Sequence, residues 1–134
     1  MNSNSEYRSY GWWVEQDPKT DRTTLIIGGR VGALRIPAEL AARVHHVLVV
    51  HLQAGPALAD GDDWVLLTQP DGRGDLPDEL AEVVAMPTGS RLALPPLDDP
   101  RWISPPRADR LAPPWQVVVS AARRAHAEIL HPTA

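Results

Sequence analysis

Short apolar runs separated by polar turn residues dominate most of the chain. Runs that are rich in β-branched or aromatic residues and bounded by Gly, Pro or Asp are typical of β-strands. The sequence predicts strands at residues 10–16, 23–27, 31–36, 57–59, 64–68, 91–94 and 102–103. Gly28 and Gly29 separate the second and third runs, so we expect these two strands to pair as a hairpin. Residues 60–63 (Asp-Gly-Asp-Asp) predict another tight turn.

Two longer stretches have the spacing of amphipathic helices. The first begins at Pro37, which suits the first helical turn, and we expect it to run to about Gln53, with Gly55 as its stop. Its expected apolar positions are Leu40, Val44, Val47, Leu48 and either His51 or Leu52. Residues 47–50 are mostly β-branched, so a strand there stays open as an alternative, although the length and the end signals favour a helix.

The second helical stretch follows Pro113 and Pro114 and covers residues 115–130. Its expected apolar face comprises Trp115, Val118, Val119, Ala122 and Ile129. A shorter helix is expected over residues 76–84. Because hairpins outnumber crossovers, the sequence predicts an α+β fold with a small mixed or antiparallel sheet, two main helices and one short helix. Residues 1–9 are expected to form a flexible N-terminus, and residues 10–131 a single domain.

Composition and charge exclude several classes of protein. The 134 residues include no cysteine, which excludes disulfides, a thiol nucleophile and cysteine metal sites. The formal net charge of −4 argues against a surface built for nucleic acid, because such surfaces are usually basic. No apolar run reaches the roughly 18 residues that a membrane span needs, and residues 1–10 lack the pattern of a signal peptide. We therefore expect a cytoplasmic protein that does not associate with membranes.

Acidic and histidine residues form two groups with the chemistry of metal ligands. Asp60, Asp62 and Asp63 offer hard oxygen atoms at close spacing, but no glutamate follows at the distance of a calcium loop. A solvated turn is the favoured interpretation. The three histidines of residues 45–51 are one, five and six residues apart, whereas helical metal pairs use an i,i+4 spacing. The sequence therefore predicts no metal site.

Arginine and tryptophan residues gather in the C-terminal third of the chain. Arginine beside aromatic side chains can grip a single nucleic-acid strand. The candidate residues are Arg101, Arg107, Arg110, Arg123 and Arg124, near Trp102 and Trp115. The favoured alternative is that these arginines pair with the carboxylates of Asp98, Asp99, Asp109 and Glu128.

Trp12 and Trp13 are adjacent in the first predicted strand. Neighbouring side chains of a strand point to opposite faces. One of the two tryptophans is therefore expected at the surface or in an interface, whereas the other tryptophans are expected in the core.

Three segments carry a family resemblance. Residues 25–41 read as an apolar strand, a glycine turn and a second strand that ends at Pro-Ala before a helix. Residues 55–70 read as a Gly-Pro strand, a turn and an aromatic-led strand, and residues 92–106 as a Pro-Pro corner followed by a tryptophan strand. In this order they resemble the small primase–polymerase-like proteins of actinobacteria, often described as bifunctional primase/polymerase N-terminal domains. The resemblance covers residues 24–125 and implies that an N-terminal segment of that fold is missing.

The resemblance also implies a loss of chemistry. Active members of that family hold divalent metals for nucleotidyl transfer with acidic residues on the second strand. The matching stretch here holds Gly32, Arg35 and Pro37, and Arg35 would repel the metals. Residues 61–64 contain no histidine where the family has one after a glycine pair, and Leu97 follows the Pro-Pro corner in place of a serine.

The sequence therefore predicts a non-catalytic relative of those proteins. We expect no enzyme activity, no catalytic residue and no cofactor. The expected function is binding to a protein partner or to a second copy of the chain, with Trp12 and Trp13 as interface candidates. The alternative is a nucleic-acid or nucleotide binding protein that uses the five arginines. A third hypothesis is a residual enzyme that uses Asp60, Asp62 or Asp63.

Overall fold

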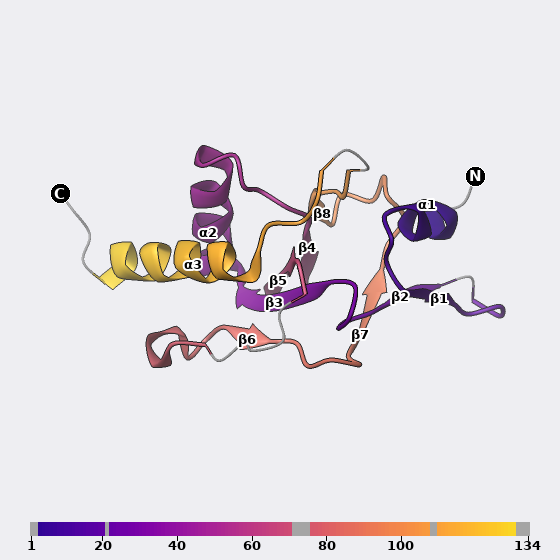
Figure 1. Cartoon of the computed structure of the whole chain (residues 1–134), viewed down its shortest axis with the longest axis horizontal. Helices are drawn as coiled ribbons and strands as arrows, with labels where there is room; N and C mark the ends of the chain where they lie inside the picture. Colours follow the sequence, from indigo (N-terminus) through magenta and orange to yellow (C-terminus); the bar gives the residue numbers. More distant parts are fainter. Residues whose placement is uncertain (1–2, 21, 71–75, 108–109, 131–134) are drawn as a thin grey trace.

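The structure is a computed structural model in which residues 3–20, 22–70, 76–107 and 110–130 are described. The helices are α1 (Ser3–Ser9), α2 (Ala38–Val50) and α3 (Trp115–Leu130), with a 3-10 turn, η1 (Asp78–Leu80). The strands are β1 (Val14–Gln16), β2 (Thr23–Ile26), β3 (Gly32–Pro37), β4 (Ala57–Asp60), β5 (Asp63–Thr68), β6 (Val84–Ala85), β7 (Arg91–Leu94) and β8 (Trp102–Ser104). Figure 1 shows α2 and α3 at one end of the molecule and α1 near the other.

The predicted α+β class is confirmed. The strands form two antiparallel sheets, one of three strands in the order β1-β2-β7 and one of five strands in the order β6-β3-β5-β4-β8. The two main helices and a short 3-10 turn accompany them. The predicted tight turn at residues 60–63 joins β4 to β5, and Gly61 has the positive φ of 63° that glycine adopts readily.

The central strands β3 and β5 are apolar on both faces. They pair with Leu34 opposite Leu66 and Ala33 opposite Leu67. Successive side chains of a strand point to opposite faces. Leu34 and Leu66 accordingly lie in the core beneath the helices, whereas Ala33 and Leu67 lie in a second core on the other face. Strands buried on both faces need nearly continuous apolar sequence, which explains the unbroken run at residues 64–67.

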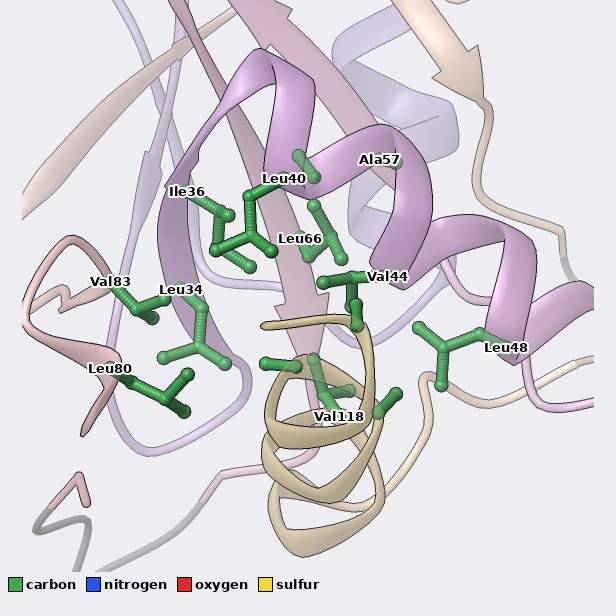
Figure 2. Close-up of a cluster of buried hydrophobic side chains, with 14 residues drawn as sticks. Leu34, Ile36, Leu40, Val44, Leu48, Ala57, Leu66, Leu80, Val83 and Val118 are labelled. Atoms are coloured by element: carbon green, nitrogen blue, oxygen red, sulfur yellow. The ribbon is translucent and has the colours of Figure 1, made fainter. Parts of the chain in front are cut away.

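Helices α2 and α3 cover one face of the five-stranded sheet. Figure 2 shows Leu40, Val44 and Leu48 of α2 gathered with Leu66 of β5 and Val118 of α3. All five side chains are buried. Burial of a Leu or Val side chain stabilises a fold by about 1.5–3 kcal/mol. This apolar contact therefore fixes both helices on the sheet.

The three-stranded sheet and α1 cover the opposite face. Leu25 of β2 and Leu92 of β7 belong to the same buried cluster as Val65 and Leu67 of β5. Tyr7 of α1 joins this cluster and is fully buried. The five-stranded sheet is thus the middle layer, with helices on one side and a second sheet on the other.

Tyr7 links α1 to the proline-rich corner after β7. Its hydroxyl donates a hydrogen bond to the Pro95 carbonyl and accepts one from the Trp102 indole Nε1–H at 3.0 Å. Its ring stacks on Trp12 with the ring centroids 5.8 Å apart. Burial is the main cause that raises the pKa of Tyr7 to about 12, so the hydroxyl stays a donor.

The predicted hairpin between residues 23–27 and 31–36 is wrong. β2 pairs with β1 and β7, whereas β3 belongs to the other sheet. The Ile27 N–H donates to the Ser90 carbonyl at 2.9 Å, and Gly28, with φ of 144°, turns the chain from one sheet to the other. A Cβ at Gly28 would lie 2.7 Å from Thr88 Cγ2, so close packing also requires glycine. The strand pattern was correct, but an apolar pattern does not specify the partner strand.

The C-terminal end of α2 also differs from the prediction. The helix ends at Val50, and Leu52 adopts the left-handed conformation with φ of 58°. Gly55 lies beyond this cap, and a Cβ there would lie 2.3 Å from Pro113 Cδ, so its role is close packing. His51 and Leu52 were offered as the end of the apolar face, but both are exposed because the chain has already left the helix.

Three further predictions need correction. Residues 1–9 were expected to be flexible, but Ser3–Ser9 form α1. Tyr7 of this helix is fully buried, and its polar neighbours in the sequence gave no sign of this contact. The expected helix over residues 76–84 is reduced to η1. The helix over residues 115–130 is confirmed, yet Ile129 is 40% exposed because α3 continues past α2 (Figure 1).

Replacing Tyr7 by phenylalanine should lower the free energy of unfolding by about 1–3 kcal/mol. The substitution keeps the ring but leaves the Pro95 carbonyl and the buried Trp102 N–H without their hydrogen-bond partner. Urea denaturation followed by tryptophan fluorescence measures the change. Tyr10→Phe is the matched control, because no hydrogen bond of the Tyr10 hydroxyl is present in the described residues; equal losses in the two variants would contradict the role assigned to Tyr7.

Candidate functional site

The side chain of Arg35 contacts the acidic turn between β4 and β5. Arg35 of β3 lies with its guanidinium 2.8 Å from an Asp60 carboxylate oxygen and 3.7 Å from an Asp63 carboxylate oxygen. All three side chains are partly exposed. The strand register causes this contact, because Arg35 and the turn lie at the same end of β3 and β5. Two of the three carboxylates that could bind a cation are therefore already paired with a cation of the protein.

Gly32 of β3 has little room for a larger side chain. Gly32 is buried, and a Cβ there would lie 2.7 Å from Thr68 Oγ1 and 3.2 Å from the Gln69 carbonyl oxygen. Pro37 ends β3 and leads directly into α2. Within the described residues, no group of three or more His, Cys, Asp or Glu side chains is gathered closely enough to hold a metal ion.

Arg101, Arg123 and Arg124, three of the candidate arginines, each lie in an ion pair of the described residues. Arg101 contacts Asp99 with a guanidinium–carboxylate distance of 3.1 Å, and hydrogen bonds from Arg101 lower the pKa of that carboxyl group. Arg123 lies 2.8 Å from Glu79, and Arg124 lies 3.5 Å from Glu128. All of these side chains are largely exposed except Asp99, and surface pairs of this kind stabilise a fold by about 0–1 kcal/mol. Asp109, a further expected partner, lies outside the described residues.

The other two candidate arginines line a surface cavity. Arg107 and Arg110 lie in the segment between β8 and α3 and face one another as an isolated β-bridge. Together with Arg30, which the sequence did not single out, they line a cavity of about 160 Å³. The five candidate arginines therefore do not form one strip, because Arg107 and Arg110 line a cavity to which Arg101, Arg123 and Arg124 do not contribute.

A second hollow is an apolar groove between α2 and α3, which we call the α2/α3 groove. It has a volume of about 450 Å³. Its lining consists of Val47, Leu48, His51, Gln116, Val117, Ser120, Ala121 and Arg124. The Arg124 guanidinium lies 3.3 Å from His51 Nε2 at its polar side. The sequence analysis missed this groove, because the apolar spacing of each helix does not show how far apart the two helices lie.

The two adjacent tryptophans differ in exposure as expected, although both precede β1 and lie outside the strand on which the prediction rested. Trp13 is 60% exposed, whereas Trp12 is half-buried and stacks on Tyr7. Trp102 is buried in the second core. Trp64 and Trp115 are half-buried against the core beneath the helices. An interface at Trp13 stays a prediction.

His45 of α2 is a titratable group inside the helical layer. Its ring meets Trp64 edge-on with centroids 6.3 Å apart, and its Nδ1 is buried without a hydrogen-bond partner among the described residues. Burial lowers the pKa of His45, because the charged imidazolium would lose its hydration. Burial therefore favours the neutral form of His45.

Comparison with protein-family models, with curated proteins and with solved structures gives no match to this chain. Among the helices of the described residues, none combines the length and apolar character that crossing a bilayer requires.

The stability of the protein should fall as the pH drops from about 7.5 to 5.5. The folded pKa of His45 is lowered below its ordinary 6.5, so in this window the unfolded chain binds the proton more readily than the folded chain. His45→Gln should remove part of this loss, as measured by melting temperature against pH. His46→Gln is the control. His46 is the exposed neighbour of His45, so this variant should keep the pH dependence of stability that the wild type shows. Identical profiles for the His45→Gln variant and the wild type would contradict the prediction.

Proposed function

We propose that this chain is a non-catalytic interaction module that binds a protein partner through the α2/α3 groove. The observation that carries the proposal is the groove itself, an apolar hollow on the outer side of the helical layer. Val47 and Val117 line it while also packing against the helical core. The surface offered to a partner is therefore backed by a packed core.

The charge at the groove indicates the chemistry of the partner. Arg124 stands at one side of the apolar surface, and its pairing with Glu128 is a surface contact at 3.5 Å. A partner carboxylate could replace that contact at little cost, because exposed ion pairs of this kind stabilise helices only weakly. Helix-in-groove recognition uses apolar anchors of one helical face. The partner that fits is an amphipathic helix with an apolar face and a carboxylate beside it.

The family resemblance and the sheet geometry support the absence of catalysis. We propose that the chain is a relative of the primase–polymerase-like proteins that has lost the metal site. Arg35 lies between Asp60 and Asp63, and the crowded backbone at Gly32 leaves no room for an acidic side chain. The nucleotidyl transfer of that family needs carboxylates free to bind metals.

A groove-filling substitution should abolish partner binding without unfolding the protein. Ser120 is exposed and lines the groove, so Ser120→Trp should fill it, and Arg124→Glu should repel the partner carboxylate. A photo-crosslinking side chain at Gln116, which also lines the groove, reports the contact in cells that make the protein. We expect one discrete adduct that disappears in both variants.

Ala127→Trp is the control for this experiment, because Ala127 is exposed on the same helix but does not line the groove. This variant should keep the adduct. An adduct that persists in Ser120→Trp, or no adduct at all, would overturn the proposal. An adduct with the mass of two chains would replace the partner by a second copy.

Millimolar Mg²⁺ or Mn²⁺ with a nucleotide should leave the melting temperature of the wild-type protein unchanged. A ligand stabilises a folded protein only if the folded state binds it, and Arg35 already pairs with Asp60 and Asp63. Arg35→Ala frees these carboxylates and should gain stability from the same ions. A rise in the melting temperature of the wild type would contradict the proposed loss of the metal site.

A further inference from the structure

A histidine and an arginine lie in contact at the polar side of the α2/α3 groove. Arg124 Nη1 lies 3.3 Å from His51 Nε2. A guanidinium has hydrogen-bond donors and no acceptor, so the two groups form a hydrogen bond only when His51 Nε2 carries no proton and accepts. The contact therefore belongs to the neutral imidazole, and it holds a titratable ring beside a permanent positive charge.

Protonation of His51 changes the chemistry of the groove. Histidine is the side chain whose charge ordinarily changes between about pH 5 and pH 8. His51 is exposed at the C-cap of α2, so the solvent supplies the proton directly. The imidazolium turns Nε2 into a donor, which leaves two like charges 3.3 Å apart at these atoms. In the free protein, Arg124 and a protonated His51 therefore repel each other.

The other charges around His51 come from the two helices that form the groove. Among the described residues that line it, His51 and Arg124 are the only charged or titratable side chains. Glu128 of α3 lies 3.5 Å from Arg124, and it is the group that a partner carboxylate would displace. On α2, His46 lies five residues earlier and on another side of the helix. The negative end of the α2 dipole attracts a cation with or without a partner.

A carboxylate placed against both cationic groups removes their repulsion. Each group then donates a hydrogen bond to it, and charge-assisted bonds of this kind are about twice as strong as neutral ones. Binding of the carboxylate and protonation of His51 favour each other, because linkage between two binding events is reciprocal. We propose that the groove binds an acidic helix with the uptake of one proton by His51, so that binding tightens as the pH falls from about 8 to about 6. This inference rests on the proposed function, since it concerns the carboxylate of that partner.

Isothermal titration with a synthetic helical peptide at pH 8 and pH 6 tests the proposal. The peptide carries leucines on one face and glutamates beside them, and a second peptide has glutamine in place of each glutamate. Glutamate ordinarily titrates near about pH 4.3, so it stays ionised in both conditions. The glutamate peptide should bind about five-fold or more tightly at pH 6, and titrations in two buffers of different ionisation enthalpy should show proton uptake. The glutamine peptide should show neither effect.

Three variants assign the effect to His51 and to the groove. His51→Gln should bind the glutamate peptide equally at both pH values, because glutamine keeps a polar side chain and takes up no proton. His46→Gln is the matched control, since His46 is exposed on the same helix but does not line the groove, and it should keep the pH dependence. Ser120→Trp fills the groove and should abolish binding at both pH values.

The possible failures of this inference and of the partner proposal differ. Equal binding of the glutamate peptide by the wild-type protein at pH 8 and pH 6 would overturn the inference and leave the partner proposal standing. A pH dependence that persists in His51→Gln would do the same. Binding that persists in Ser120→Trp, or no binding by the wild-type protein at either pH, would overturn both.

Discussion

Burial of β3 and β5 on both faces is the constraint on which the rest of this structure depends. A shift of one residue in their register would exchange the side chains that enter the two cores. Leu34 and Leu66 would then leave the helical core, and Ala33 and Leu67 would leave the second core. A sheet of this kind needs a cover on each side. The helices α2 and α3 cover one face, and the three-stranded sheet with α1 covers the other. Both covering layers are therefore needed to bury the central strands.

This constraint also explains where binding can occur. The middle layer offers almost no buried polar chemistry, since Thr68 of β5 is the one buried polar side chain among the described residues of its strands. The charged groups described above lie near the ends of strands and on the outer surfaces of the covering layers. Arg35 lies at the turn end of the central sheet, the arginine-lined cavity lies where β5 and the segment after β8 meet, and the groove lies between the helices. In a protein built in this way, the polar surfaces that a ligand could reach lie at the margins of the sheet.

The apolar pattern was sufficient to predict most strands, both main helices and the α+β class, because periodicity reflects local burial. It was insufficient for the pairing of β2, since Gly28 is compatible with a hairpin as well as with the observed corner between sheets. It also missed α1, where one tyrosine among polar residues provides the buried contact. The candidate site was predicted only in part. Arg107 and Arg110 were named, but their meeting with Arg30 depends on a long-range contact that no local pattern encodes.

The proline pairs connect these observations. Each pair lies where the chain leaves one layer for another, and proline requires no partner for a backbone N–H at such a corner. The Pro95 carbonyl accepts the Tyr7 hydroxyl, Pro106 is buried at the cavity, and Pro113 packs against Gly55 while its carbonyl accepts the Gln69 N–H. The corners thus use their carbonyl groups for structure. Because the Pro95 and Pro113 carbonyls accept hydrogen bonds within the fold, these corners join the layers and leave neither of those two acceptors for a ligand.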